Sequence, residues 1–456
     1  MEAKARRPAR PRPPARPDDA GTVLDLTVSD VAHGGWCVAR DPGGRVVFVR
    51  HALPGERVRA KITQSGAKFA RADAVEILTA SPDRVEPPCP HARPGGCGGC
   101  DWQHATLPAQ RRLKAEVVRR QLQRIAGIDR EVTVEPLAPG ETGLDWRTRV
   151  RYSVAPDGTA GLLAHRSHTV VDVGDCPIAH PLVRAAGVPG LRWERTGSVE
   201  VVVSPGPGER AAIVAGPPAA GRRAAALLAG RADTVLVGGR GGRLTTVTGR
   251  GYLRRAAAGR SWRVGAGAFW QVHPAAPAVL TEAVLAALGP QPGEVALDLY
   301  CGAGLFAGAL AGAVGPGGTV IGVDSDRAAV RDARHNLRRV PWARIHAGDV
   351  AAVLSRGGWP QASLAVLDPP RTGAARTVLA QLLASPAGGQ PQPGGRSGGD
   401  RRPGLRKVAY VSCDPATLAR DIAVFAQAGW QLDALRAFDA FPMTHHVECV
   451  ATLSPG

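Results

Sequence analysis

The chain has 456 residues, and its 57 Lys and Arg against 39 Asp and Glu give a formal net charge of +18. This length allows about three domains, and the basic excess points to a polyanionic partner, most often nucleic acid. The eight cysteines are unevenly spread, which argues against the disulfide framework of a secreted protein. No secretory signal is visible, and the uncharged run 299–323 is too rich in glycine for a membrane span. We therefore expect a cytoplasmic monomer without a membrane anchor.

The first 83 residues predict a tail followed by a small barrel. Residues 1–20 are basic and proline-rich, which is typical of a disordered tail. Residues 21–83 contain short alternating runs separated by glycine and proline turns, which predict an OB-type β-barrel, a common nucleic-acid binder. The expected strands are 23–28, 45–49, 57–62 and 70–77. The basic residues suited to RNA are Lys61, Lys68, Arg71 and Arg84. A purely structural barrel is the alternative.

A group of cysteines follows the barrel. Cys97 and Cys100 form a Cys-x-x-Cys pair flanked by glycines, and Cys89 precedes it. A closed site needs a fourth thiolate, and Cys176 lies in a similar loop setting. Four thiolates suit either zinc or a [4Fe–4S] cluster, and the spacing alone does not separate the two.

The cysteines belong to a predicted central domain, residues 84–258. An amphipathic helix is expected over 107–125, with an apolar stripe and a strongly basic opposite face. This helix is a candidate to pack on the domain that follows, residues 259–456. The remainder of the segment contains short β-type runs with glycine turns, which predict a β-rich domain.

Residues 259–456 alternate between strand and helix patterns and predict a Rossmann-like α/β domain. The buried run 295–299 leads into a loop with Tyr300 and Gly302, and the next strand ends at Asp324. Such a unit binds a nucleotide, and the acidic residue takes the ribose hydroxyls. Ala307 stands where a dinucleotide fingerprint has its third glycine, which favours S-adenosylmethionine. Asp349 follows a third strand and suits the adenine amino group.

Two further strands end in chemically distinctive turns. Residues 364–367 precede the acidic turn Asp368-Pro369-Pro370-Arg371, and a strand near 408–411 precedes Cys413. A helix pattern follows that cysteine, so its thiol is expected at the ligand-binding edge of the sheet, where a helix amino terminus favours the thiolate. A small buried thiol is the alternative. Residues 386–403 are rich in Gly, Pro and Arg and predict a flexible insertion.

Together these motifs resemble the S-adenosylmethionine-dependent RNA uracil-5-methyltransferase family. The resemblance covers nearly the whole chain after residue 20 and includes a TRAM-type barrel and an iron–sulfur motif. The matching segments are 46–56, 97–104 with Cys89 and Cys176, 269–272, 298–302, 368–371, 412–415 and 441–448. Asp414 departs from the pattern, because family members usually have Asn after the nucleophile.

The resemblance implies methylation of a uridine in tRNA or rRNA at carbon 5. Cys413 is then the nucleophile that attacks carbon 6, and Glu448 is the base that removes the carbon-5 proton. The implied cofactor-binding residues are Gln271, Tyr300, Gly302, Asp324, Asp349 and Asp368. The implied cluster ligands are Cys89, Cys97, Cys100 and Cys176, with [4Fe–4S] favoured over zinc. The main alternative function is a non-catalytic RNA-binding protein that retains the fold.

Overall fold

The computed structural model describes residues 18–239, 242–356, 360–384 and 404–456. The chain divides into two compact units, one that ends at Arg84 and one that begins at Val85. The predicted insertion 386–403 and most of the predicted tail 1–20 lie outside the described residues. Among the helices of the described ranges, none is long and apolar enough to cross a membrane.

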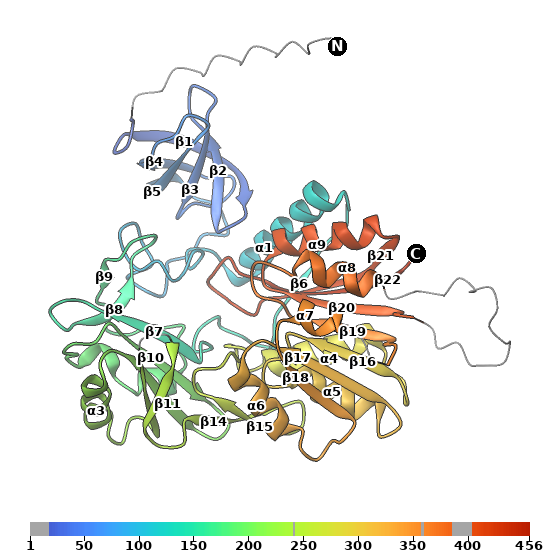
Figure 1. The fold of residues 1–456 in the computed structure, drawn as a ribbon. Helices are drawn as coiled ribbons and strands as arrows, with labels where there is room; N and C mark the ends of the chain where they lie inside the picture. Colours follow the sequence, from blue (N-terminus) through green and yellow to red (C-terminus); the bar gives the residue numbers. More distant parts are fainter. Residues whose placement is uncertain (1–17, 240–241, 357–359, 385–403) are drawn as a thin grey trace, which may run out of the picture. The chain divides into compact units, whose positions relative to one another are not determined.

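The first unit is a closed five-stranded barrel with strand order β1-β2-β3-β5-β4 (Figure 1). Alternate residues of β4 are buried and exposed, which is the pattern of a strand with one face on a core. The predicted OB-type barrel is thus present, with one strand, β2, that sequence reasoning missed. The strands are β1 Val23–Ala32, β2 Trp36–Arg40, β3 Val46–Arg50, β4 Arg57–Gln64 and β5 Phe69–Thr79.

Arg84 has a structural role in this unit. It donates hydrogen bonds of 2.6 and 2.7 Å to the two carboxylate oxygens of Glu56, which is fully buried. A buried carboxylate needs such a partner, so Arg84 is not available as an RNA contact. Lys61 and Lys68 are exposed on the barrel.

The second unit begins with a β-rich region built on a seven-stranded sheet of order β13-β12-β11-β10-β7-β8-β9. Its strands are β7 Arg149–Val154, β8 Ala160–Leu163, β9 Val170–Val171, β10 Ser198–Ser204, β11 Glu209–Ala215, β12 Thr234–Gly238 and β13 Leu244–Thr248. Its helical segments are α2 Pro181–Arg184, η2 Val188–Gly190 and α3 Pro218–Leu227. The β-rich centre expected from the sequence is therefore present.

A hairpin of β14 (Tyr252–Ala257) and β15 (Arg260–Gly265) connects this region with the α/β region. The backbone N–H of Gly265 donates to Asp332, in a helix of the α/β region, at 2.6 Å. The expected domain boundary at 258/259 falls in the turn of this hairpin. Because the hairpin and its contacts continue across that boundary, the two regions form one compact unit.

The α/β region contains an eight-stranded sheet of order β18-β17-β16-β19-β20-β22-β21-β6. The strands from β18 to β20 are parallel, and β22 runs antiparallel to its neighbours. The strands are β16 Val295–Leu299, β17 Thr319–Asp324, β18 Ala343–Ala347, β19 Leu364–Leu367, β20 Lys407–Ser412, β21 Trp430–Phe438, β22 Glu448–Pro455 and β6 Val134–Glu135. The predicted Rossmann-like α/β architecture is confirmed.

Helices cover both faces of this sheet (Figure 1). One face packs against α4 (Ala276–Leu288), α5 (Leu305–Val314) and α6 (Arg327–Asn336). The other packs against α7 (Val350–Ser355), α8 (Arg376–Ala384) and α9 (Pro415–Gln427). Helix α1 (Leu107–Gln121), continued by the π-helical turn η1 (Leu122–Ala126), adds Val118 and Leu122 to this second core. The amphipathic helix seen in the sequence thus packs on the α/β region.

Candidate active site

Cys413 and Glu448 come together because two antiparallel strands meet at one edge of the sheet. Ser412, the last residue of β20, pairs with Cys449 in β22. Cys413 therefore leaves the carboxyl end of β20 beside Glu448, the first residue of β22. Glu448 is 2% exposed, and Cys413 is half-buried. The structure brings together the two residues that the sequence analysis selected for catalysis.

The surroundings of Cys413 favour the neutral thiol. Burial, with a further contribution from the Glu448 carboxylate, raises the pKa of Cys413 to about 12. The guanidinium of Arg371 opposes this rise through its charge and a hydrogen bond. The amino terminus of α9 was expected to favour the thiolate, and burial acts in the opposite direction in the free protein.

Asp414, the unusual residue beside the thiol, caps helix α9. Its Oδ1 accepts hydrogen bonds from the backbone N–H groups of Ala416 at 3.0 Å and Thr417 at 2.9 Å. These are donors that a helix start leaves without partners, and Asp and Asn both satisfy them well. The substitution of Asp for the usual Asn therefore preserves the local backbone.

Glu448 shares its buried setting with another acid. Burial raises the pKa of Glu448 well above its ordinary value, and the charge of Asp368 adds to the rise while Arg371 opposes it. Burial also raises the pKa of Asp368, with a contribution from Asp324. Like charges in a poorly solvated site do not ionise independently, so this group of acids favours the approach of a cation or a proton.

Three carboxylates mark the carboxyl ends of adjacent strands. Asp298 lies in β16, Asp324 ends β17, and Asp368 follows β19. Burial raises the pKa of Asp298 to about 8, and the charges of Asp368 and Asp324 add to the rise. The hydrogen bond from the backbone N–H of Ala307 stabilises the carboxylate and acts in the opposite direction. Its Oδ1 is buried without a hydrogen-bond partner among the described residues. Sequence reasoning did not select Asp298 as a contact, although an acid inside an apolar strand was the available signal.

The loop after β16 is tied to β17. The backbone N–H groups of Tyr300 and Cys301 donate to the Val323 carbonyl at 2.9 and 3.0 Å, and Gly302 N–H donates to Asp324 Oδ2 at 2.8 Å. Tyr300 has φ +69°, a left-handed conformation that is rare for a residue with a side chain. Such strain is a common property of ligand-binding loops. Three predicted cofactor residues, Tyr300, Gly302 and Asp324, thus belong to one hydrogen-bonded unit.

The remaining predicted cofactor residues lie in separate segments. Asp349 follows β18 and caps α7, accepting from Ala352 N–H at 2.9 Å. Its position after a parallel strand places it at the same sheet edge as Asp324. Gln271 is buried in the segment between β15 and α4. Its contact with a cofactor stays a prediction.

The four cysteines proposed as ligands line one small cavity in the second unit. Cys89, Cys97, Cys100 and Cys176 surround it together with Gln103 and Arg147. Gln103 accepts from the backbone N–H of Cys89 at 3.0 Å and so joins two parts of the loop. Within the described ranges, no group of three or more His, Cys, Asp or Glu side chains is arranged to hold a single metal ion.

The glycines around these cysteines are required by close backbone approach. A Cβ atom at Gly98 would lie 2.6 Å from the Cα of His165, and one at Gly96 would lie 2.3 Å from the His91 carbonyl oxygen. Neither backbone could move aside without opening the loop. The glycines that flank the cysteine pair therefore have a direct steric cause.

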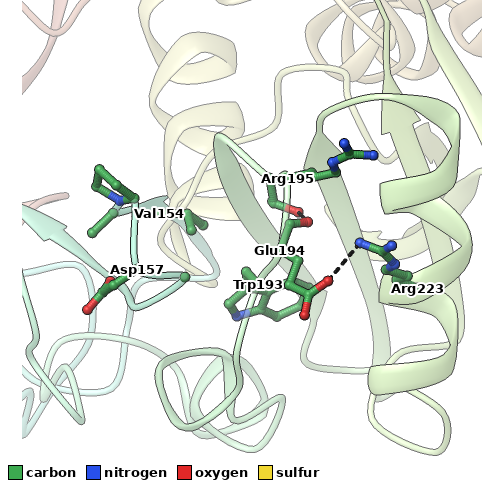
Figure 2. A pocket seen from close by; sticks show the side chains of 10 residues that line it. Val154, Asp157, Trp193, Glu194, Arg195 and Arg223 are labelled. Carbon is green, nitrogen blue, oxygen red and sulfur yellow. Dashed lines mark hydrogen bonds and ion pairs between the residues drawn. The ribbon is translucent and has the colours of Figure 1, made fainter.

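A different pocket lies in the β-rich region, between the turn after β7 and residues 193–196 (Figure 2). Its polar lining includes Asp157, Glu194, Arg195 and Arg223, and Arg223 forms an ion pair of 3.0 Å with Glu194. The predicted site residues do not line it. The acids and cations of its wall offset one another, so its chemistry does not select a ligand class.

Comparison with protein families matches residues 19–75 to the TRAM domain and residues 403–455 to tRNA (uracil-5-)-methyltransferase. An uncharacterized RNA methyltransferase of Streptomyces avermitilis is 48% identical over 447 residues, which cover 95% of this chain and 99% of that relative. A 23S rRNA (uracil(1939)-C(5))-methyltransferase of Chromohalobacter salexigens is 32% identical, with 96% of this chain and 90% of that protein covered. The chain belongs to the RNA uracil-5-methyltransferase family.

A solved structure has the same fold as this family member. The tRNA (uracil-54, C5)-methyltransferase of Pyrococcus abyssi, in complex with S-adenosyl-L-homocysteine, matches with a TM-score of 0.67 and 21% identity. The match covers 94% of this chain and 99% of that chain. The fold class predicted from the sequence is thereby confirmed. The family and the enzyme class, an RNA uracil-5-methyltransferase, are confirmed by the relatives.

Proposed function

We propose that the protein methylates carbon 5 of a uridine in structured RNA through a covalent bond between Cys413 and carbon 6 of the base. The observation that carries this proposal is the pairing of Ser412 with Cys449, because it places the Cys413 thiol beside the buried Glu448. A nucleophile and a base are both needed, since carbon 5 of uracil is too weak a nucleophile to take a methyl group directly.

The proposed reaction has three steps: attack on carbon 6, methyl transfer to carbon 5, and elimination of the cysteine. The thiolate of Cys413 bonds to carbon 6, and the electron pair of the carbon 5–carbon 6 double bond moves toward the carbonyl at carbon 4. Carbon 5 would then use this electron pair to bond to the methyl group of S-adenosylmethionine, and the pair of the broken sulfur–methyl bond would stay on sulfur, which leaves as the neutral thioether S-adenosylhomocysteine. Glu448 then takes the proton from carbon 5, the double bond re-forms, and the Cys413 thiolate leaves.

Glu448 suits the proton-transfer step through its environment. A carboxylate with a raised pKa holds a proton more strongly than an exposed one, so it is a better base toward carbon 5. Arg371 suits the first step, because its charge lowers the pKa of the Cys413 thiol. We infer that Asp368 and Arg371 also position the pyrimidine ring.

The acidic sheet edge suits the methyl donor. S-adenosylmethionine carries a sulfonium and an ammonium group. The charge of Asp324 adds to the raised pKa of both Asp298 and Asp368 at this edge, so a cation bound there would relieve the repulsion. Each oxygen of Asp324 accepts one backbone hydrogen bond, from Gly302 or Asp326, and keeps a second lone pair for a ribose hydroxyl. We assign Gln271, Tyr300 and Asp349 to the same cofactor.

For the four cysteines we propose a [4Fe–4S] cluster as the bound group. In such a cluster each thiolate binds a different iron, so the sulfurs stand farther apart than around one zinc ion. The four cysteines that line one cavity supply the four thiolates that such a cluster needs. The reaction passes no electrons, so the cluster would hold the loop in place.

The RNA must present its base outside the stack, because the thiol lies in a half-buried site. Phe269 is 65% exposed in the segment that also contains Gln271, so core packing does not account for it. We infer that it stacks on RNA. Ribosomal RNA is the first substrate to test because a relative that matches nearly the whole chain is named for 23S rRNA, and tRNA is the second.

The test is formation of 5-methyluridine in RNA by purified protein and S-adenosylmethionine, read by mass spectrometry. Wild type should methylate one of the two RNAs, and Cys413→Ser should form no product while it still binds the methyl donor. Cys37→Ser is the matched control, because that thiol lies in the barrel and a hydroxyl can keep its hydrogen bond to Ala52. RNA binding without methylation by wild type would instead support the non-catalytic alternative.

A further inference from the structure

The segment Asp439–Val447, here called the catalytic loop, joins β21 to β22 and ends directly before Glu448. It contains no helix or strand of its own. The segment Cys100–Lys114 lies far from the catalytic loop in the sequence but forms hydrogen bonds and an ion pair with it. Both the loop that contains Cys100 and the first half of α1 take part.

Met443 is the most tightly held residue of the catalytic loop. Its φ of +68° is left-handed, which a non-glycine residue adopts only where its surroundings enforce it. Its N–H donates to Gln110 Oε1 at 2.8 Å, and its carbonyl accepts from the N–H groups of Asp101 and Trp102 at 3.1 Å each. Gln110 is fully buried and is itself anchored by a 2.9 Å hydrogen bond to the Ala105 carbonyl.

Two further contacts hold the ends of the catalytic loop. Lys114 and Asp439 form a fully buried ion pair, and Lys114 Nζ also donates to the Phe441 carbonyl at 3.0 Å. At the other end, His445 Nδ1 lies 2.6 Å from Asp101 Oδ2. These partners satisfy polar groups that a buried irregular segment would otherwise leave unpaired.

The catalytic loop also contacts Arg371. Nη2 of Arg371 lies 3.5 Å from Nε2 of His446, and the ring of His446 packs against Phe441. Arg371 is the cation that acts on Cys413. One end of the catalytic loop thus leads into Glu448, and its side chains contact the residue that stabilises the thiolate.

We propose that Asp101, Gln110 and Lys114 are positioning residues that fix the catalytic loop, and through it the placement of Glu448 and Arg371 relative to Cys413. The inference rests on the proposed function. Asp101 adjoins Cys100, so the loop that we expect to bind the iron–sulfur cluster is also the one that holds the catalytic loop. The cluster loop would then serve catalysis by fixing geometry.

The test compares Gln110→Ala with Gln123→Ala, an identical change at an exposed residue beyond the end of α1. Gln110→Ala should lower kcat about 10- to 100-fold, the range expected for a small misplacement of catalytic groups, and leave the RNA KM unchanged. The fraction of protein trapped as a methylated covalent RNA adduct should rise, because elimination depends on Glu448. Gln123→Ala should match wild type in all three measurements.

A second pair of variants keeps the inference testable if Gln110→Ala does not fold. Asp101→Asn retains an acceptor for His445 and should keep most of the activity, whereas Asp101→Ala should reproduce the loss of kcat and the excess adduct at normal iron content. If the variants melt earlier but keep the wild-type kcat and adduct fraction, the contacts are only structural and the inference is overturned. If wild type forms neither product nor adduct, the proposed function itself fails.

Discussion

The carboxylate of Glu448 raises the pKa of the Cys413 thiol, because the antiparallel pairing of β20 and β22 brings the two side chains together. A base and a nucleophile that share a buried site oppose each other's ionisation. The resting enzyme therefore keeps its thiol protonated even with Arg371 beside it, and the thiolate forms when a bound ligand further offsets the negative charge. This arrangement protects the thiol from reaction with other electrophiles, since the thiolate is the nucleophilic form.

The pKa of about 12 predicts how the free enzyme reacts with a simple alkylating reagent. Because Cys413 loses its proton as the pH rises, the thiolate share should grow about tenfold per pH unit while the pH stays below the pKa. Alkylation of Cys413 by iodoacetamide, followed by peptide mass spectrometry, should therefore accelerate from pH 7 to pH 10 without reaching a plateau. A plateau near pH 8 would contradict the raised pKa.

The same measurement isolates the part played by Glu448. Glu448→Gln removes the nearby charge, so the pKa of Cys413 should fall and alkylation at pH 8 should become faster. Glu131→Gln neutralises an exposed carboxylate elsewhere in the second unit and serves as the matched control. Equal rates in all three proteins would mean that the charge of Glu448 does not contribute to the pKa of the thiol.

The proton-transfer role of Glu448 predicts a trapped intermediate. Glu448→Gln should still allow the attack of Cys413 and the transfer of the methyl group, but glutamine cannot take the carbon-5 proton. The variant should accumulate a methylated protein–RNA adduct that survives denaturing electrophoresis, and Cys413→Ala and the double variant should form none.

His446 is the nearest alternative base, and its environment argues against it. Burial and the neighbouring His445 lower the pKa of His446 to about 3, which makes its imidazole a weak proton acceptor. The raised pKa of Glu448 makes the carboxylate the stronger base. If Glu448→Gln nevertheless turns over normally, His446 becomes the candidate for removing the carbon-5 proton.

The sequence predicted the order of strands and turns in the α/β region because each motif there is local. An apolar run that ends in Asp324, Asp368 or Cys413 identifies a strand and its functional end together. It could not predict the pKa of Cys413, since burial and the Glu448 charge depend on how distant strands pair. It also could not assign Arg84 to Glu56 or Gln110 to Met443, because nothing in a local pattern specifies a partner for a buried polar group.

For the cofactor, Asp324→Ala and Asp324→Asn should differ. The carboxylate holds the N–H of Gly302 as well as that of Asp326, so alanine removes the support of the loop along with the expected ribose contact. Asparagine keeps one oxygen acceptor, so its affinity for S-adenosylmethionine should lie between those of wild type and alanine. Isothermal titration measures this order, and unchanged affinity in the alanine variant would move the cofactor to another part of the chain.

Asp414 predicts a separation between stability and reactivity. Because Asn caps a helix about as well as Asp, Asp414→Asn should leave the melting temperature near that of wild type, whereas Asp414→Ala should cost about 1 kcal/mol. The pKa of Cys413 is raised by burial and then by Glu448, so Asp414→Asn should change its alkylation less than Glu448→Gln does. A larger change in the alkylation rate for Asp414→Asn than for Glu448→Gln would show that Asp414 controls the pKa of the thiol.

The last prediction concerns the group bound by the four cysteines. Protein purified without oxygen should be brown and contain about four irons per chain, as one [4Fe–4S] cluster requires. Cys97→Ser should lose most of this iron, and Cys37→Ser in the barrel should keep it. If the cluster holds the loop around Cys100 in place, loss of iron should also lower the melting temperature, because a group bound only by the folded protein stabilises it. A colourless protein with one zinc per chain would instead mean that Cys89, Cys97, Cys100 and Cys176 close around a single ion, and it would contradict the cluster.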